Sequence, residues 1–462
     1  MSAAKIFAGE FTQDSLHNIY DEYISITSAI GVDRLSRTAF EQRLNSEVAL
    51  IAGKAHEGTY RFSQYKEKLI SKGAEKLPRV ISIPTYRDRI TLRALCNVLK
   101  KSFDSQLNVR LPQHTVSELR VGLANGNYNH FLKLDVSNFY PSIDHTILRT
   151  ALKRKIRKTE LHQLISSAIE SPTVAFPDRS KPKSDRGVPQ GLAISNILAE
   201  IYLSKFDTWA KNIPNVGYFR YVDDIFFLVK NDPVPLFESI KLRLFDQLGL
   251  KVHELGNSGK SVSGLVADKF HFLGYEFKHG KARVKIDSMH RIEASLAKIL
   301  TTYKYKCAAS QATANAFERS NLLAKAAKIC AWRLNLRITG CLFDDVRRGW
   351  VFYFSQIDDE AIAQLHHLDK TLRVLARRFA FDPKDLKSFV RTFHESKRSN
   401  LSHRYIPNFD ATSVAEQRDI LEMYGMEGVA TMTDVQVTRA FKRRIRKETS
   451  QLEQDIQGGS RG

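Results

Sequence analysis

Cysteine is scarce in this sequence, with four in 462 residues, and the four are far apart. The positions of Cys96, Cys307, Cys330 and Cys341 exclude the paired spacing of a zinc site and give no disulfide framework. Long apolar runs are also missing, because no stretch of about 18 apolar residues occurs, and the N-terminus lacks a signal-peptide pattern. These absences predict a cytoplasmic protein with no membrane association.

Acidic residues are in deficit. Asp and Glu number 50 against 71 Lys and Arg, so the formal net charge is +21. Such an excess favours a polyanionic partner, because each phosphate that a cation neutralises releases condensed counterions. An anionic membrane surface or simple solubility would be the alternatives, and nucleic acid is the better interpretation. A hydrophobic content of 43% is enough for extensive cores.

Two adjacent carboxylates, Asp223 and Asp224, follow Tyr221 and Val222 between two short apolar runs. Aromatic and β-branched residues on both sides predict two strands that meet at a tight turn. Two acids at a turn repel each other unless a cation neutralises them, and Mg²⁺ suits carboxylate oxygens. A solvated turn is the usual interpretation of an isolated Asp-Asp pair, so the metal-site hypothesis depends on the rest of the chain.

A third carboxylate lies near the end of another expected strand. Apolar and polar residues alternate over 132–137, which is the period of a half-buried strand, and this places Asp135 near its C-terminal end. Pro141 then opens a helix. A lone Asp in such a position is more often structural, but a two-metal site would need one opposite Asp223 and Asp224.

Cations gather on an expected strand-turn-helix unit. A strand over 79–84 begins with Arg79, and Arg87 and Arg89 precede a helix over 90–99. Guanidinium groups match phosphate geometry, so this unit could grip a triphosphate. A solvated basic face is the alternative.

The sequence Pro-Gln-Gly precedes another expected helix at residues 189–191. Gly187 and Gly191, on either side of the three residues 188–190, let the backbone approach a ligand closely, and Gln190 could reach that ligand from the loop. An ordinary loop before a helix is the alternative. Further along, a helix is expected over 234–248 and a short strand near a turn over 272–277. Between them, Lys260 lies in a loop without the upstream glycine of a phosphate-binding P-loop.

The two ends of the chain are predicted to be helical. Residues 1 to about 60 carry no chemistry that we can name, and the chain is strongly basic from about residue 288 onward. Aromatic residues follow cations over 347–354, where they could stack on nucleic acid. Helix core is the more common role of such side chains.

In chain order, these motifs resemble the fingers and palm of a reverse transcriptase over roughly residues 60–280. The runs PRVISIPTYRDRI and RRGWVFYF are similar to those of the defence-associated and abortive-infection reverse transcriptases of bacteria, with retron and group II intron enzymes as relatives. The resemblance implies an α+β right-hand polymerase fold. Fingers and palm, with a ferredoxin-like antiparallel palm sheet, would occupy 61–285, between an N-terminal helical segment (1–60) and a basic helical thumb and C-terminal region (286–462).

The resemblance also implies roles for individual residues. Asp135 and Asp223 would bind two Mg²⁺ ions, assisted by Asp224 and the Val136 carbonyl, because two metals can stabilise both oxygens of an in-line displacement. Tyr140 would exclude a ribose 2′-hydroxyl. The remaining assignments are Arg79, Arg87 and Arg89 to the triphosphate, Gln190 and Gly191 to the nucleotide and template side, Tyr221 and Val222 to the primer end, and Lys260 to protonation of pyrophosphate.

The implied activity is RNA-directed DNA synthesis from dNTPs at a primer 3′ end, in a phage-defence setting, with DNA as product or primer. Protein-primed or untemplated DNA synthesis is an alternative, as is a retron or group II intron type of enzyme that acts on its own structured RNA. A nucleic-acid-binding scaffold with an inactive polymerase domain is a third alternative, against which the three acids and Gln190 argue. An oligomer and partner proteins are left open.

Overall fold

Strand β3 lies inside a four-stranded antiparallel sheet with the order β5-β6-β3-β7. These strands are β3 (His130–Asp135), β5 (Val216–Tyr221), β6 (Asp224–Val229) and β7 (Val262–Leu265). The pairing of β3 with β6 runs from His130 opposite Val229 to Asp135 opposite Asp224. The alternation in the sequence is therefore realised as a strand, and Asp135 is its last residue.

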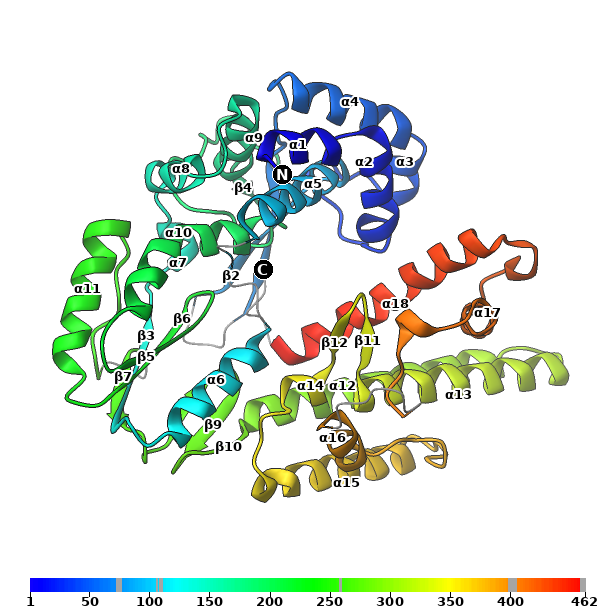
Figure 1. The fold of residues 1–462 in the computed structure, drawn as a ribbon. Helices are drawn as coiled ribbons and strands as arrows, with labels where there is room; N and C mark the ends of the chain where they lie inside the picture. The colour runs from blue at the N-terminus through cyan, green and yellow to red at the C-terminus, as the bar shows by residue number, and fades with distance from the viewer. Residues whose placement is uncertain (72–76, 105–106, 108–110, 257–259, 398–404, 458–462) are drawn as a thin grey trace. The chain divides into compact units, whose positions relative to one another are not determined.

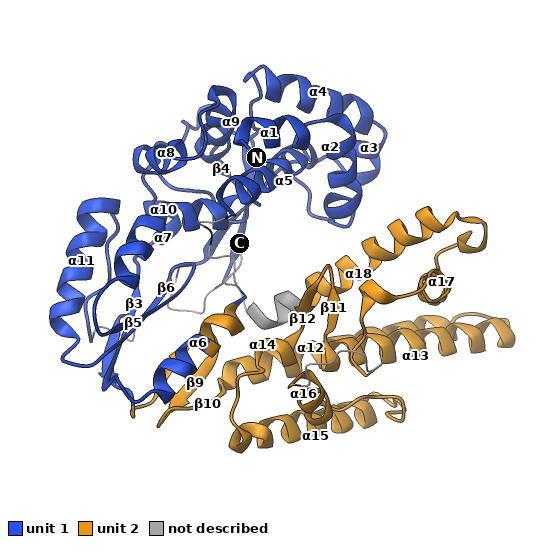
Figure 2. Ribbon diagram, in the orientation of Figure 1, with its two compact units in different colours: residues 1–111, 118–266, 462 blue, residues 112–117, 267–461 orange. Residues whose placement is uncertain are grey.

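The computed structural model describes all residues except 72–76, 105–106, 108–110, 257–259, 398–404 and 458–462. The described chain divides into two compact units (Figure 2). The first comprises residues 1–111 and 118–266, and the second comprises 112–117 and 267–461. The predicted boundaries at residues 60 and 285 stay predictions.

The two faces of the β3 sheet pack differently. Leu132, Leu134 and Phe227 belong to the main core of the first unit, to which α10 and α11 also contribute. On the other face, the rings of Phe131 and Phe226 stack with centroids 5.7 Å apart. The division of these residues between the two faces follows from the two-residue period of a strand, in which neighbouring side chains point to opposite faces.

The other elements of the first unit surround this core and a second, three-stranded sheet ordered β2-β1-β4 (Figure 1). Its strands are β1 (Tyr65–Ile70), β2 (Arg79–Ile83) and β4 (Thr173–Val174). Its helices are α1 (Ala3–Glu10), α2 (Gln13–Ile19), the π-helix η1 (Tyr20–Ile24), α3 (Arg37–Glu41), α4 (Leu44–His56), α5 (Tyr86–Phe103), α7 (Phe139–Ser142), α8 (His145–Lys153), α9 (Thr159–Glu170), α10 (Ser195–Lys211) and α11 (Val234–Leu248). Helix α6 (Pro112–Ala124) has residues in both units.

The second unit is mainly helical. Its strands are β8 (Phe270–Phe272), β9 (Tyr275–Lys278), β10 (Lys281–Val284), β11 (Cys341–Phe343) and β12 (Val346–Arg348). Its helices are α12 (Ile286–Gln311), α13 (Ala316–Thr339), α14 (Trp350–Tyr353), η3 (Asp359–Ala361), α15 (Ile362–Arg378), α16 (Phe389–Lys397), η4 (Phe409–Ala411), α17 (Val414–Met423), η5 (Val429–Thr431) and α18 (Asp434–Gln457). None of the helices in the described part of the chain is both long enough and apolar enough to cross a membrane.

Two expectations for the second unit are resolved. The short strand expected near a turn over 272–277 is not continuous, because Leu273 and Gly274 both have positive φ and form the turn of the β8–β9 hairpin within this range. The aromatics of 347–354 are core residues, since Trp350, Phe352 and Phe354 are buried. The α+β prediction, with antiparallel sheets and a helical C-terminal region, is confirmed.

A buried carboxylate joins the segment before β1 to the start of α5. Asp88 is fully buried and accepts hydrogen bonds from the Tyr60 hydroxyl at 2.8 Å, the Ser63 N–H at 3.1 Å and the Thr85 hydroxyl at 2.8 Å. The Thr85 hydroxyl in turn caps α5 by accepting from the Asp88 N–H at 3.2 Å. A single side chain thus satisfies three donors from two separate segments of the chain.

Replacement of Asp88 by Ala should destabilise the first unit. The change leaves the three donors without their acceptor in a buried site, so we expect the free energy of unfolding to fall by about 3 kcal/mol. Urea denaturation of the purified chain measures the difference. Asp246→Ala, on an exposed position of α11, is the control and should stay within about 0.5 kcal/mol. Equal stabilities of the two variants would contradict the role given to Asp88.

Candidate active site

The turn between β5 and β6 consists of Val222 and Asp223, flanked by the cross-strand pair Tyr221 and Asp224. Val222 has a φ of 57°, in the left-handed region that a β-branched residue rarely adopts. Such backbone strain costs roughly 1–3 kcal/mol and persists only where the surroundings fix it. The predicted tight turn is present, with Asp223 in the turn and Asp224 directly after it, and its first residue is strained.

Strand pairing brings the third acid to this turn. Asp135 lies directly opposite Asp224 in the β3–β6 register, and directly opposite side chains project from the same face of a sheet. Burial, together with the charge of Asp135, raises the pKa of Asp223, while Arg79 opposes the shift. Burial and the charges of Asp223 and Asp135 raise the pKa of Asp224 to about 6. The three carboxylates therefore share one electrostatic environment.

This environment fits a divalent cation. Among the described residues, no three His, Cys, Asp or Glu side chains are arranged as a metal cluster. Mg²⁺, however, is usually held by one or two carboxylates together with substrate phosphates and water. Acids that repel one another in a partly dry site are stabilised by such a cation. The Val136 carbonyl is not used by the backbone bonds that flank it, which join Ser137 N–H to Lys251 O and His253 N–H to Asp135 O.

Tyr140 lies close to the acids and is held by a partner that sequence reasoning missed. Its hydroxyl donates to Asn196 Oδ1 at 2.6 Å, from α7 to the first turn of α10. Burial and then the charge of Asp223 raise the pKa of Tyr140, so the hydroxyl stays protonated. The position of Asn196, just inside the helix that follows the Pro-Gln-Gly segment, was the available signal.

The Pro-Gln-Gly loop packs directly on β2. The Ser82 N–H donates to the Gln190 carbonyl at 2.7 Å. Gly191 has a φ of 103°, and a Cβ at this position would lie 2.8 Å from Ile81 Cγ2 and 3.0 Å from the Ser82 carbonyl oxygen. Glycine is therefore required both by the conformation and by the close approach.

The three arginines assigned to the triphosphate lie in different surroundings. Arg79, at the start of β2, is near enough to lower the pKa of Asp223 against the effect of burial. Arg87 forms an ion pair with Glu47 at 3.6 Å. Arg89 donates to Thr27 Oγ1 at 3.0 Å and to the Ala29 carbonyl at 2.6 Å. In this structure Arg79 acts on the acids, whereas Arg87 and Arg89 hold the N-terminal segment.

Lys260 and Asp135 are linked through His253. Lys260 Nζ lies 3.1 Å from His253 Nε2. His253 Nε2 in turn lies 3.7 Å from Asp135 Oδ2. Sequence reasoning gave His253 no role, because its proximity to Asp135 arises from the short backbone bridge between Val136 and Val252.

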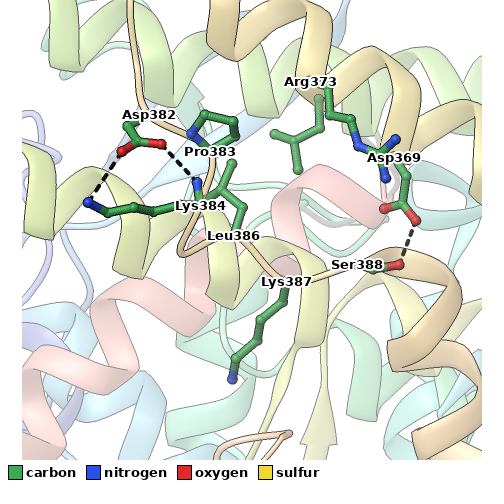
Figure 3. A pocket seen from close by; sticks show the side chains of 9 residues that line it. Asp369, Arg373, Asp382, Pro383, Lys384, Leu386, Lys387 and Ser388 are labelled. Carbon is green, nitrogen blue, oxygen red and sulfur yellow. Dashed lines mark hydrogen bonds and ion pairs between the residues drawn. The ribbon is translucent and has the colours of Figure 1, made fainter.

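A separate pocket of about 300 Å³ lies in the second unit, between α15 and the segment before α16 (Figure 3). One of its two carboxylates, Asp369, is already used, because it accepts from the Ser388 hydroxyl at 2.6 Å and the Phe389 N–H at 2.7 Å. None of the predicted site residues lines this pocket. All of them lie in the first unit.

Comparison with known proteins shows which family the segment that holds these residues resembles. The reverse transcriptase (RNA-dependent DNA polymerase) family model matches residues 70–277. This segment is a reverse transcriptase domain. The prediction of an RNA-directed DNA polymerase, a nucleotidyltransferase, is confirmed at the level of this domain.

The reverse transcriptase domain has bacterial relatives. The chain is 24% identical to protein YkfC of Escherichia coli K12 over 296 residues, which cover 55% of this chain and 77% of that protein. It is 27% identical to the group II intron-encoded protein LtrA of Lactococcus lactis over 158 residues, which cover 33% of this chain but only 26% of LtrA. The predicted resemblance to prokaryotic reverse transcriptases is thereby confirmed.

Solved structures similar to this chain include telomerases. A Candida albicans telomerase in complex with a fragment of telomeric RNA has a TM-score of 0.40 and 12% identity, over 86% of this chain and 69% of that one. A truncated apo telomerase from Candida tropicalis has a TM-score of 0.38 and 14% identity, over 54% of this chain and 61% of that one. Scores this low are below the level at which a common fold can be inferred.

The crowded acids predict an unusual pH dependence of stability for the reverse transcriptase domain. Because the pKa of Asp224 is raised to about 6 in the folded chain, the folded state holds a proton that the unfolded state releases at lower pH. The free energy of unfolding without divalent cations should therefore fall as the pH rises from about 4 to about 6. Asp224→Asn should remove part of this loss and stabilise the chain at pH 8 by on the order of 1 kcal/mol, because the side chain keeps some contact with water.

Thermal unfolding in EDTA from pH 4 to pH 8 measures this effect. Asp246→Asn, an exposed position on α11, controls for the loss of one negative charge. Parallel pH profiles for the native chain and Asp224→Asn would contradict the electrostatic coupling of the acids.

Proposed function

We propose that this chain is an RNA-directed DNA polymerase that adds deoxynucleotides to a primer 3′ end with two Mg²⁺ ions. The observation that carries the proposal is the position of Asp135 opposite Asp224, beside the Asp223 turn, within the segment that matches the reverse transcriptase family. Asp135 and Asp223 would bind both ions, with Asp224 and the Val136 carbonyl assisting. Bound there, the ions would stabilise the attacking 3′-oxygen and the leaving pyrophosphate.

The remaining assignments follow from the surroundings of the acids. Arg79 would bind the triphosphate, because its charge already acts on Asp223. Arg87 and Arg89 would contribute only after they leave their present partners, Glu47 and the Thr27–Ala29 segment.

The loop and turn residues complete the proposed site. Gln190 and Gly191 would line the nucleotide and template side, and Tyr221 and Val222 would contact the primer end. Lys260 would donate a proton to the leaving pyrophosphate, a role that requires its ammonium group to move from His253 to the phosphate.

The proposed partners are an RNA template, a DNA primer or product, and dNTPs. The net charge of +21 supports a polyanionic partner, and the match of residues 70–277 to a family of RNA-dependent DNA polymerases supports RNA as the template. By resemblance to the abortive-infection enzymes, we propose an antiphage role. The four free cysteines support the cytoplasmic setting that we propose.

A second candidate is an enzyme that acts on its own structured RNA, such as a cognate non-coding RNA. Similarity to LtrA, a group II intron-encoded protein, favours it. Sequencing of RNA and DNA that copurify with the protein separates the cases, since one recurrent RNA with its complementary DNA indicates the second candidate. A DNA product that stays attached to the protein after denaturation would instead indicate protein priming.

Loss of the turn acids should abolish synthesis and spare binding. Asp223→Ala with Asp224→Ala removes the proposed ligands, so Mg²⁺-dependent dNTP incorporation on a primed RNA should fall at least about 1,000-fold. RNA affinity, measured by fluorescence anisotropy, should change by no more than about threefold. The control removes the same charge from exposed positions of α11 by Glu238→Ala with Asp246→Ala. Undiminished incorporation by the turn variant would refute the site.

Removal of the Tyr140 ring should admit ribonucleotides. Tyr140→Ala takes away the group that would clash with a 2′-hydroxyl, so the preference for dNTP over NTP should drop by about 10- to 100-fold in kcat/KM. Tyr140→Phe keeps the ring and loses only the bond to Asn196, and it should retain most of the discrimination. An unchanged preference in Tyr140→Ala would count against the gate.

A further inference from the structure

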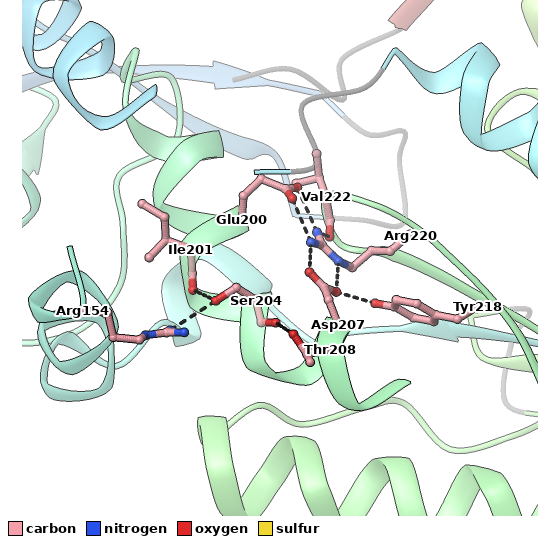
Figure 4. A network of polar contacts seen from close by, with 9 residues as sticks. All are labelled: Arg154, Glu200, Ile201, Ser204, Asp207, Thr208, Tyr218, Arg220 and Val222. Atoms are coloured by element: carbon pink, nitrogen blue, oxygen red, sulfur yellow. Dashed lines mark hydrogen bonds and ion pairs between the residues drawn. The ribbon is translucent and has the colours of Figure 1, made fainter. Parts of the chain in front are cut away.

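Arg220, the residue before the proposed primer contact Tyr221, is buried with 5% of its surface exposed. Its guanidinium donates to both oxygens of Glu200, at 2.9 and 2.8 Å, and to both oxygens of Asp207, at 2.6 Å from Nε and more closely from Nη2. Figure 4 shows these groups converging from α10 and β5. Burial opposes the charged form, but the two carboxylates outweigh it and raise the pKa of Arg220.

The guanidinium of Arg220 also donates a hydrogen bond to the turn. Arg220 Nη1 also donates to the Val222 carbonyl oxygen at 2.8 Å. Val222 is the strained residue, with a φ of 57°, and the next residue is Asp223. The bond therefore stabilises a backbone conformation that valine disfavours, directly before Asp223.

Helix α10 supplies the fixed end of this arrangement. Glu200 and Asp207 are seven residues apart, so they lie on the same face of α10, about two turns from each other. Asp207 is further oriented by the Tyr218 hydroxyl at 2.6 Å. The same helix carries Asn196, which holds Tyr140. Thus the proposed sugar gate and the acidic turn are both aligned to one rigid element.

We propose that Arg220 is a positioning residue, clamped by Glu200 and Asp207, that holds the Val222–Asp223 turn in the conformation required for nucleotide addition. The inference rests on the proposed polymerase function and adds a residue to its site. Arginine is required because its planar fork reaches five acceptor atoms in three groups at once, whereas a lysine ammonium is a point charge that cannot match them. A purely structural ion pair would not need the bond to Val222.

The test compares one substitution in two backgrounds. Arg220→Lys should lower kcat for dNTP incorporation by about 10- to 100-fold, as expected for a misplaced catalytic group, with KM for dNTP and RNA affinity changed less than about threefold. Glycine adopts positive φ without strain. In a chain that also carries Val222→Gly, the loss caused by Arg220→Lys should therefore shrink to less than about fivefold.

Arg154→Lys is the matched control. Arg154 also binds α10, through Ser204 Oγ at 3.2 Å, and among the residues that the structure describes it makes no bond to the turn (Figure 4). The same chemical change there should leave kcat within about twofold. Hydrogen exchange gives a readout independent of activity, because peptides covering 221–225 should exchange faster in Arg220→Lys and not in Arg154→Lys.

An equal loss in the Val222 and Val222→Gly backgrounds would overturn the proposal, as would unchanged exchange at the turn. If Arg220→Lys does not fold, Glu200→Gln serves in its place. It keeps the bonds of Arg220 to Asp207 and Val222 and should give a smaller loss, about 3- to 10-fold, with the same dependence on Val222→Gly. Absence of synthesis by the native chain would instead mean that the polymerase function is wrong, which distinguishes the two failures.

Discussion

The pairing of β3 with β6 is the constraint on which the site depends. Only one register places Asp135 opposite Asp224 while Leu132 and Leu134 enter the core. A slip by one residue would send every side chain of the strand to the opposite face, so burial of the apolar set and convergence of the acids are specified together. Hydrophobic burial thus supplies the free energy that brings mutually repelling carboxylates to one edge of the sheet.

Charged groups have different surroundings around Arg220 and at the turn between β5 and β6. Around Arg220, two carboxylates and a guanidinium satisfy one another through direct hydrogen bonds, so the cluster is complete within the protein. At the turn, the charges of Arg79 and Lys133 only partly offset burial and mutual repulsion, so the pKa values of Asp223 and Asp224 stay raised. The Arg220 cluster is bonded to the turn through the Val222 carbonyl oxygen, so a fully hydrogen-bonded group supports the crowded acids.

Local patterns predicted much of the fold. The helix over 234–248 and the strand that ends at Asp135 follow from the spacing of their apolar residues. This spacing is local information, because it can be read from a short stretch of sequence. Over 272–277 a strand near a turn is expected, but the two-residue turn lies inside the apolar run, and the run alone does not give its position. Of the site, the acids and Tyr140 could be named from motifs. The partners His253, Glu200 and Asp207 could not, because each meets its partner only through tertiary folding. Asn196 follows the Pro-Gln-Gly motif closely, but its bond to Tyr140 also depends on tertiary folding.

The close contact at Gly191 has a consequence for engineering. The loop meets β2 through backbone atoms and one methyl group, with no room for a side chain at this position. The contact therefore fixes the distance between the two backbones. It places less restriction on the identity of the neighbouring loop side chains. A chimera that imports this loop from another polymerase would have to import strand β2 with it, since the two surfaces fit each other as a pair.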